Sequence, residues 1–350
     1  NNIAASAGGG IFLLGSSGIA NISGTTFNRN ISQYGGGILA NDATLNISAS
    51  SVFDGNQATV EDGGGIAVLS GVASISGGTL FESNGAFNDG GGISIDFGST
   101  ATIEDSRFVS NSVTDDGGGI YVSEVSTATV DTVELSNNTA VDNGGGLYVS
   151  SDSRAVLSDV EVTGNTASNV GGGLVLASDS TVIVEDSRFA NNTAGDDGGG
   201  IYVSTASTAT IDTVEVSNNT AIDGGGGLYV STGSTATFTD VDVSSNTARV
   251  GGGLRTLNSD VTVASSGAAP LAGRFTRNQA VRRSSTQPID SGDPTVAAGG
   301  GIEQTGGTLM ISNVRIARNE AEGDGGGLAI NGDATTGVDR QTEYLVNQAE

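Results

Sequence analysis

Three side chains that commonly carry chemistry are missing from this chain of 350 residues. It contains no cysteine, so disulfide bonds and thiol chemistry are excluded. It also contains no histidine, the side chain most used for acid–base catalysis and for binding transition metals near neutral pH. Lysine is absent as well, so all 13 positive charges are arginines. The absence of histidine and lysine already counts against an enzyme.

Positive charge is scarce, and long apolar runs are absent. Against the 13 arginines stand 39 acidic residues, which gives a net charge of −26. Such a charge disfavours nucleic acids and anionic membrane surfaces as partners. The longest apolar runs are only a few residues, as at Ile11 to Leu14, so we expect no membrane insertion by this segment. The chain has no initiator methionine and no signal-peptide pattern, and we expect it to be part of a longer protein.

What the chain does contain is glycine in a fixed pattern. Gly-Gly-Gly followed by Ile or Leu occurs twelve times, mostly at intervals of 27 residues. The triplets begin at Gly8, Gly35, Gly63, Gly90, Gly117, Gly144, Gly171, Gly198, Gly225, Gly251, Gly299 and Gly325. A fixed period in this range indicates a repeat architecture in which each unit stacks on the next. We therefore expect a single solenoid domain over residues 1–350, with about twelve coils of about 27 residues.

A second column of residues fixes the register of the repeat. In each coil an apolar residue stands three positions before an asparagine, as Phe108 does before Asn111. In the central coils these asparagines are Asn111, Asn138, Asn165, Asn192, Asn219 and Asn246. We interpret them as a structural ladder at a tight turn, in which the side-chain amides bond to their copies in neighbouring coils. The glycine triplets mark a bend that needs positive φ and a close approach of adjacent coils.

The segments between these columns predict strands. They alternate with a period of two and are rich in β-branched residues, as in Ile120-Tyr121-Val122. Frequent glycine and turns rich in Ser, Thr and Asn disfavour helices. Two or three short strands per coil, each paired with its copy one coil away, predict an all-β parallel β-helix. The Ile or Leu after each triplet, and the apolar residue two positions later, are expected to point inward.

The regular spacing breaks once, between Asn278 and Gly299. The insert at residues 281–298 reads VRRSSTQPIDSGDPTVAA, and we expect it to project from the solenoid as a loop. Loops carry recognition more often than the coils do, and this loop brings positive charge to an acidic protein. Its candidate recognition residues are Arg282, Arg283, Asp290 and Asp293.

Two repeated features of the coil surface offer further candidate sites. The first is an outward column of tyrosines, Tyr121, Tyr148, Tyr202 and Tyr229. Stacked tyrosines bind sugar rings or pack against a partner, and simple cross-strand stacking is the alternative. The second is a set of acidic pairs before the triplets, which are either calcium ligands or solvated turn residues. These pairs are Asp115 with Asp116 and Asp196 with Asp197. Calcium at these pairs is the one cofactor that the sequence suggests.

The paired motifs Phe-x-x-Asn and Gly-Gly-x-(Ile/Leu) resemble the repeats of chlamydial polymorphic membrane proteins. They are also similar to the Asn-Thr-Ala and Gly-Gly-Gly-(Ile/Leu)-Tyr repeats of bacterial right-handed β-helix surface proteins. The resemblance covers essentially the whole chain. It implies a right-handed parallel β-helix that is secreted or exposed on the cell surface, and several such proteins are implicated in adhesion. The third glycine and the lack of cysteine depart from the chlamydial pattern.

These observations favour a non-enzymatic extracellular or cell-surface protein, either structural or adhesive. Its expected partners are other copies of the protein, a host or cell-surface protein, or a glycan. One alternative is a self-assembling filament subunit, because uncapped terminal coils leave strand edges that allow end-to-end association. Another is a polysaccharide-binding or polysaccharide-processing β-helix. Processing needs carboxylates that converge in a cleft, whereas the acids of this chain recur with the coil.

Overall fold

The computed structural model describes residues 1–231, 233–267, 273–281, 298–339 and 341–349. The strands of these residues belong to three parallel sheets, and no helix occurs among them. The repeat is a parallel β-solenoid of about twelve coils with about 27 residues each, as the glycine period predicts. The chain divides into two compact units, Asn1–Arg188 (unit 1) and Phe189–Glu350 (unit 2).

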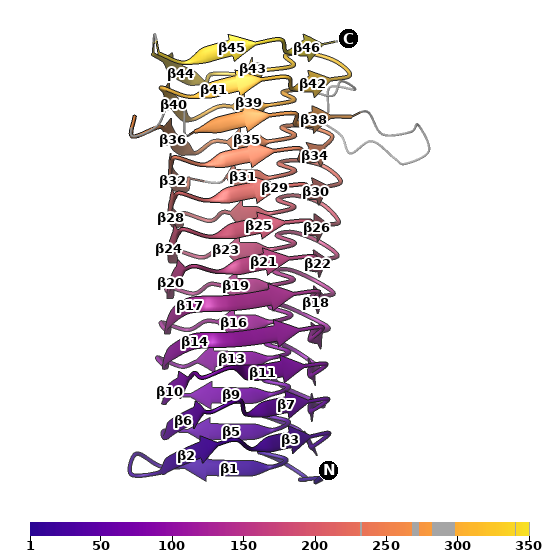
Figure 1. Cartoon of the computed structure of the whole chain (residues 1–350), viewed down its shortest axis with the longest axis vertical. Helices are drawn as coiled ribbons and strands as arrows, with labels where there is room; N and C mark the ends of the chain where they lie inside the picture. Colours follow the sequence, from indigo (N-terminus) through magenta and orange to yellow (C-terminus); the bar gives the residue numbers. More distant parts are fainter. Residues whose placement is uncertain (232, 268–272, 282–297, 340, 350) are drawn as a thin grey trace. The chain divides into compact units, whose positions relative to one another are not determined.

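In unit 1 each coil begins with a strand that directly follows a glycine triplet, and these strands form the first sheet (Figure 1). They are β1 (Ile11–Leu14), β5 (Ile38–Asn41), β9 (Ile66–Leu69), β13 (Ile93–Asp96), β16 (Ile120–Val122), β19 (Leu147–Val149) and β23 (Leu174–Leu176). Each strand pairs in parallel with its copy one coil away, so Ile93 lies beside Ile66 and beside Ile120.

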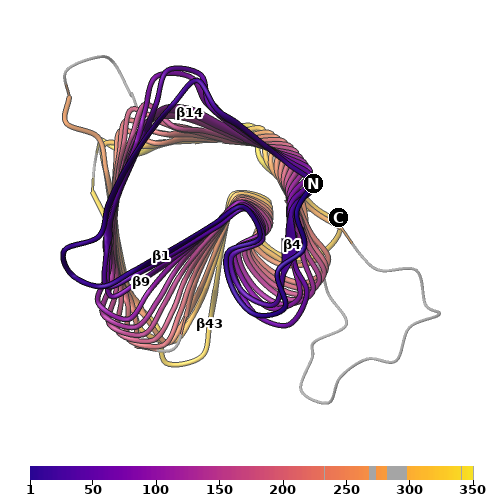
Figure 2. The same cartoon turned by 90° about the horizontal axis from the view of Figure 1, so that it is seen from below.

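The rest of each coil of unit 1 supplies the second and third sheets. The second sheet contains β2 (Ile19–Ser23), β3 (Thr26–Asn28), β6 (Thr44–Ser48), β7 (Val52–Asp54), β10 (Val72–Ile75), β11 (Thr79–Glu82), β14 (Thr100–Val109), β17 (Thr127–Ser136), β20 (Arg154–Ser158), β21 (Glu161–Thr163) and β24 (Thr181–Glu185). The third sheet contains β4 (Ile31–Ser32), β8 (Gln57–Ala58), β12 (Gly85–Ala86), β15 (Ser112–Val113), β18 (Thr139–Ala140) and β22 (Thr166–Ala167). Figure 2 shows that β1, β14 and β4 lie on different sides of the coil.

Unit 2 has the same arrangement. Its first sheet contains β27 (Ile201–Val203), β31 (Leu228–Ser231), β35 (Leu254–Leu257), β39 (Ile302–Thr305) and β43 (Leu328–Asn331). Its second sheet contains β28 (Thr208–Asp212), β29 (Glu215–Ser217), β32 (Thr235–Thr239), β33 (Asp242–Ser244), β36 (Asp260–Ala264), β37 (Arg274–Thr276), β40 (Thr308–Ser312), β41 (Arg315–Ala317), β44 (Thr335–Val338) and β45 (Glu343–Leu345), and β25 (Arg188–Ala190) lies at the boundary of the units. Its third sheet contains β26 (Thr193–Ala194), β30 (Thr220–Ala221), β34 (Thr247–Ala248), β38 (Gln279–Ala280), β42 (Glu320–Ala321) and β46 (Gln348–Ala349).

The number of strands per coil differs from the sequence prediction. Two or three were expected, whereas most coils contain four short strands, because the strand pair of the second sheet is interrupted. The interruption is a residue with left-handed backbone, such as Ser50 with φ 54° between β6 and β7. A single such residue ends the regular strand pairing locally and turns the chain. Alternation alone does not reveal where this turn falls.

The interior of unit 1 is built from columns of identical side chains. The rings of Phe27, Phe53, Phe81 and Phe108 stack face to face, with 4.4–4.8 Å between centroids. This spacing matches the distance between neighbouring strands, about 4.8 Å, because each ring stands on the copy of the same position. The isoleucines that follow the later triplets, including Ile66 and Ile93, are fully buried as predicted, whereas Ile11 of the first coil is partly exposed.

The asparagine column forms a buried ladder in each unit. In unit 1 the Nδ2 and the backbone N–H of Asn111 both donate to Oδ1 of Asn138 in the next coil, at 3.0 and 2.9 Å. The same Nδ2 donates to the carbonyl of Phe81 at 3.0 Å, so the amide group is fully used. Unit 2 repeats the pattern, with Nδ2 of Asn219 donating to Oδ1 of Asn246. The ladder closes the turn and satisfies the buried polar groups of each coil.

The glycine triplets occupy a bend where neighbouring coils come into contact. Gly90 has φ +65°, a conformation that side chains rarely adopt. The second glycine, Gly91, would place a Cβ atom 2.5 Å from the carbonyl oxygen of Gly118 in the next coil. The triplet therefore meets both requirements that the sequence pattern predicted, positive φ and close approach.

Candidate functional site

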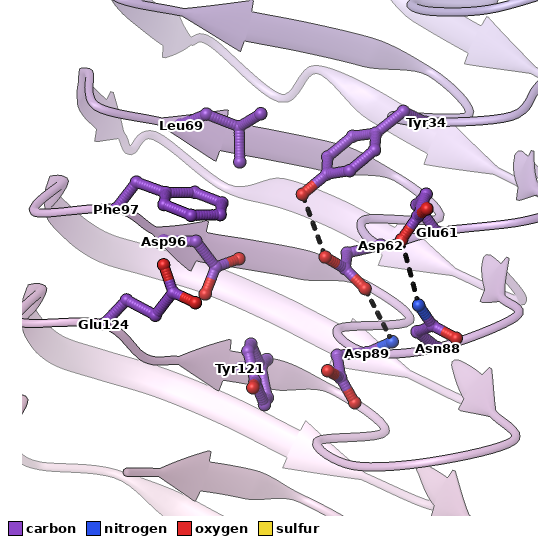
Figure 3. A pocket seen from close by; sticks show the side chains of 10 residues that line it. All are labelled: Tyr34, Glu61, Asp62, Leu69, Asn88, Asp89, Asp96, Phe97, Tyr121 and Glu124. Atoms are coloured by element: carbon purple, nitrogen blue, oxygen red, sulfur yellow. Dashed lines mark hydrogen bonds between the residues drawn. The ribbon is translucent and has the colours of Figure 1, made fainter. Parts of the chain in front are cut away.

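Unit 1 contains a cavity of about 390 Å³ on the outer side of the first sheet, here named the acidic pocket. It is lined by Tyr34, Glu61, Asp62, Leu69, Asn88, Asp89, Asp96, Phe97, Tyr121 and Glu124. Figure 3 shows two walls, with Tyr34, Asp62 and Asp89 on one side, Leu69, Phe97 and Glu124 on the other, and Asp96 and Tyr121 between them. Five of these lining side chains are acidic, and none of the ten is basic.

One wall of the acidic pocket is an aspartate ladder in the turns before the triplets. Oδ1 of Asp62 accepts from the backbone N–H of Asp89 at 3.1 Å, and Oδ1 of Asp89 accepts from the N–H of Asp116 at 2.9 Å. Asn143 continues the ladder, because its N–H and Nδ2 both donate to Oδ1 of Asp116. One oxygen of each carboxylate thus accepts a hydrogen bond from the next coil. The second oxygen of Asp62 accepts from the hydroxyl of Tyr34 at 2.9 Å.

Two small residues interrupt an otherwise bulky column of the first sheet near the pocket. Successive strands of the first sheet place Leu39, Ala67, Ser94, Tyr121 and Tyr148 side by side at one outward position. Ala67 and Ser94 are fully buried, and neither fills the volume that a tyrosine occupies in the following coils. Neither of them lines the cavity, whose lining includes Leu69 of β9, Asp96 of β13 and Tyr121 of β16.

Asp96 is the most buried acid of the pocket, with 3% of its surface exposed. Its carboxylate accepts a hydrogen bond from the hydroxyl of Ser94, and no basic side chain of the described residues forms an ion pair with it. Burial raises the pKa of Asp96 to about 8, with smaller contributions from the charges of Asp62 and Asp89. Burial also raises the pKa of Asp89 to about 8 and raises the pKa of Asp62. At neutral pH Asp89 and Asp96 are therefore largely protonated, and a positive charge beside them favours their ionised form.

Phe97 stands at the rim of the pocket in an unusual conformation. Its φ is 58°, and 54% of its surface is exposed. Ser70 and Glu124 have the same left-handed backbone in the adjacent coils, so the turn is part of the repeat and only the side chain differs. A bulky residue rarely adopts positive φ, and an exposed ring there offers an apolar contact to a ligand.

The predicted tyrosine column occurs as two stacked pairs. The rings of Tyr121 and Tyr148 lie 5.5 Å apart in unit 1, and those of Tyr202 and Tyr229 lie 5.2 Å apart in unit 2. The four rings are less exposed than an outward column implies, and Tyr229 is buried. Burial raises the pKa of each phenol, so all four stay neutral in ordinary buffers.

Unit 2 fills the corresponding surface with an arginine. The guanidinium of Arg255 lies over the ring of Tyr229, with Cζ 5.4 Å from the ring centroid. Its nitrogens lie 3.8 Å from Asp197, 3.9 Å from Asp223 and 3.5 Å from Glu303. These distances exceed hydrogen-bond length, so the contacts are electrostatic. Three carboxylates and an aromatic ring thus surround one partly buried cation.

The predicted calcium ligands lie in two groups of three aspartates. Asp115 and Asp116 gather with Asp89 in unit 1, and Asp196 and Asp197 gather with Asp223 in unit 2. In each group, one carboxylate oxygen per residue lies within 4.8 Å of the others. Calcium at these positions stays a prediction.

Some predicted residues fall outside the described part of the chain, and some pocket residues were not predicted. Arg282, Arg283, Asp290 and Asp293 of the insert at 281–298 lie outside the described residues. The sequence argument also missed Tyr34, Asp62, Asp89, Asp96 and Phe97. The available signal was the column after each triplet, where Ala67 and Ser94 precede two tyrosines. The expectation that acids only recur with the coil is wrong here, because five acidic side chains converge on one pocket.

Among the described residues, the structure contains no helix of the length and apolarity needed to cross a membrane. No curated protein and no solved structure matches the chain. A family model does match it, under the description right handed beta helix region, over residues 1–158 and 91–268. These two matches together cover more than half of the chain and agree with the observed stack of parallel coils. The chain therefore belongs to the family of right-handed β-helix regions.

Proposed function

We propose that this protein is a non-enzymatic adhesive β-helix, exposed outside the cell, that binds its partner through the acidic pocket. The observation that carries the proposal is the lining of that pocket. It combines five acidic and three aromatic side chains around a cavity of about 390 Å³. A concave site with aromatic walls and a few fixed polar groups is the usual form of a ligand-binding site. The surrounding coils act as the scaffold that holds these groups in place.

The lining of the pocket favours binding over catalysis. No basic side chain lines the pocket to neutralise a charged substrate. The fold alone does not decide the question, because β-helices carry many functions.

The location outside the cell rests on the repeat and on composition. The Phe-x-x-Asn and Gly-Gly-Gly-(Ile/Leu) motifs resemble those of secreted β-helix surface proteins. A net charge of −26 keeps such a protein soluble and limits its association with nucleic acids and anionic membranes. Labelling of intact source cells with an antibody to the repeat tests this location, and labelling only after lysis contradicts it.

The binding role is tested by filling the pocket without changing its charge. In the variant Ser94→Tyr, position 94 receives the side chain that Tyr121 and Tyr148 provide in the next two coils. The matched control is Thr129→Tyr, which makes the same chemical change at an exposed position of β17 in the second sheet. Immobilised wild-type protein and both variants are screened against glycan and peptide arrays. We expect ligands that bind the wild type and Thr129→Tyr but not Ser94→Tyr.

Further measurements on the same proteins distinguish the adhesive, enzymatic and filament functions. An array without any ligand for the wild type contradicts the adhesive role. Release of reducing ends or unsaturated sugars from polysaccharides, lost in Ser94→Tyr, identifies an enzyme instead. Sedimentation at increasing protein concentration tests the filament alternative, and growth of long assemblies with no array ligand favours that alternative over adhesion.

A further inference from the structure

The acidic pocket of unit 1 and the arginine cluster of unit 2 are two versions of one arrangement. In both, an outward position of the first sheet lies directly beside a tyrosine of the neighbouring strand. Arg255 is paired with Tyr229 in this way, and Ser94 is paired with Tyr121. In both, the aspartates of the turns before the triplets stand opposite the tyrosine. The arrangements differ in the residue at the outward position, an arginine in unit 2 and a serine in unit 1, and in its side of the ring. Arg255 follows Tyr229 by one coil, whereas Ser94 precedes Tyr121 by one coil.

Arg255 shows what such an arrangement holds when it is filled from within the chain. Its guanidinium is placed over an aromatic face and is surrounded by carboxylates of three neighbouring coils. A guanidinium is well suited to this environment, because it is planar, weakly hydrated and permanently charged. It interacts with the ring through its face and with the acids through its edge.

The acidic pocket has the same anionic and aromatic groups but lacks the cation. Asp62, Asp89 and Asp96 line it, Tyr121 supplies the ring, and Phe97 supplies an exposed apolar rim. Asp96 is 3% exposed, and its only side-chain hydrogen bond among the described residues comes from Ser94. A carboxylate this buried is stabilised when a positive charge pairs with it. The cavity beside it has a volume of about 390 Å³, which leaves room for a side chain from another molecule.

We propose that the acidic pocket binds the guanidinium group of an arginine side chain from a basic segment of a partner protein. In the bound state the guanidinium lies over the ring of Tyr121 and between the carboxylates of Asp62, Asp89 and Asp96. The aliphatic part of the arginine packs against Phe97. The net charge of −26 draws a basic segment toward the protein, and the pocket then selects the side chain.

This inference rests on the proposed function, because it names the ligand of the site through which that function acts. The adhesive role and the arginine ligand can be disproved independently. A neutral glycan that binds the wild type but not Ser94→Tyr leaves the adhesive role standing and overturns the arginine ligand. An arginine peptide that binds in the pocket while intact cells show no surface protein supports the ligand and overturns the extracellular role.

The experiment uses a short capped peptide of alternating glycine and arginine as the probe. Its control is the same peptide with citrulline in place of arginine, which keeps the shape of the side chain and removes the charge. Titration calorimetry measures both peptides against the wild type at low and moderate salt. We expect the citrulline peptide to bind at least about tenfold more weakly, because it loses the charge-assisted contacts with the aspartates.

Three variants locate the binding. Ser94→Tyr keeps the charge of the protein and fills the pocket, so it separates pocket binding from general attraction to an acidic surface. Asp96→Asn removes the carboxyl group that would pair with the guanidinium and keeps the shape of the side chain. Thr129→Tyr is the control at an exposed position of β17. We expect the first two to weaken arginine-peptide binding by about tenfold or more and the control to leave it unchanged. Circular dichroism and thermal melting confirm that each variant is folded.

Several outcomes overturn the proposal. Equal binding of the arginine and citrulline peptides shows that the charge is not recognised. Equal binding by the wild type and Ser94→Tyr shows that the peptide is held elsewhere on the acidic surface. Absence of binding at low salt, where electrostatic attraction is strongest, excludes an arginine ligand. Calcium chloride or a neutral sugar could instead give a calorimetric binding signal that Ser94→Tyr abolishes, while the arginine peptide gives none. That result assigns the pocket to the calcium ion or the sugar.

Discussion

The hydroxyl of Tyr34 donates a hydrogen bond to Oδ2 of Asp62 across one coil, at 2.9 Å. Asp62 uses its other oxygen to accept the backbone N–H of Asp89, so its carboxylate joins three coils. This contact fixes the wall of the acidic pocket, because the aspartate cannot turn away without losing both partners. It also holds the carboxyl group of Asp62 near Asp96, the buried acid between the two walls.

We predict that Tyr34→Phe destabilises the protein and that the effect depends on pH. The substitution removes the donor and leaves the carboxylate of Asp62 in its partly buried position. The free energy of unfolding should fall by about 1 kcal/mol at high pH, where the carboxylate is charged, and by less at a pH low enough to protonate it. Denaturant unfolding at the two pH values measures the difference. An equal loss at both pH values would mean that the hydrogen bond is not to the charged carboxylate.

The stability of the whole protein should rise as the pH falls from about 8 to about 5. Burial raises the pKa of Asp96 and Asp89 to about 8, from an ordinary value near 3.8. The folded state then holds more protons than the unfolded state between about pH 4 and pH 8, so the free energy of unfolding decreases as the pH rises through this range. Each such group contributes up to about 1.4 kcal/mol per pH unit.

Asp96→Asn isolates one of these contributions. The amide has no charge to bury, so we predict a variant that is more stable than the wild type at pH 8 and less sensitive to pH. Chemical denaturation over the pH range gives both quantities. The ion pair with Arg107 lowers the pKa of Glu134, so this group changes the free energy of unfolding only below about pH 4.5. It therefore does not affect the comparison between pH 5 and pH 8. A variant with the pH slope of the wild type would rule out Asp96 as a source of that slope.

The asparagine ladder and the surface ion pairs should differ sharply in their effect on stability. Asn111→Ala leaves the N–H and the amide of Asn84 without an acceptor and the carbonyl of Phe81 without a donor, all in the buried turn. We predict a loss of about 4 kcal/mol in the free energy of unfolding. Arg107→Ala breaks an exposed ion pair with Glu134 and should cost less than about 1 kcal/mol. Similar losses for the two variants would contradict a structural role for the ladder.

Two glycine substitutions distinguish the cost of a steric clash between coils from the cost of a side chain at positive φ. In Gly91→Ala the new Cβ atom meets the carbonyl oxygen of Gly118 at 2.5 Å, and we predict a loss of about 3 kcal/mol or more. In Gly98→Ala the Cβ atom has open space but the residue has φ +73°, so the loss should be about 1 kcal/mol. Thermal and chemical unfolding of the two variants checks the order. The reverse order would show that the coils can separate at the triplet at little cost.

The aspartate groups of the turns should respond to neutralisation and to cations. Asp115 lies with Asp89 and Asp116, and burial raises the pKa of all three carboxyls. Asp115→Asn relieves repulsion among them, and we predict a higher melting temperature at low salt and a smaller gain at high salt. If calcium binds here as the sequence predicts, calcium chloride raises the melting temperature of the wild type beyond the effect of sodium chloride at equal ionic strength. A chelator reverses the gain, and Asp115→Asn reduces it.

Much of the fold follows from the sequence because a solenoid repeats one local solution. The period of the glycine triplets sets the length of a coil, and the alternation after each triplet sets which side chains face inward. Asn111 and its copies are predictable because a buried amide at a tight turn is satisfied by the same amide one coil away. The alternation did not predict the four short strands per coil, although the left-handed residue that divides them is often aspartate, as at Asp159, Asp186 and Asp240.

The pocket forms only in the tertiary structure. Tyr34, Asp62, Asp96 and Tyr121 belong to different coils and are separated by many residues in the chain. Each looks like an ordinary member of its column, and only parallel stacking brings them onto one surface. The cavity is lined by side chains of several coils, so it is a property of neighbours and not of a motif. The sequence alone therefore determined the coil, because its period is local, whereas the site needed the packing of several coils to exist.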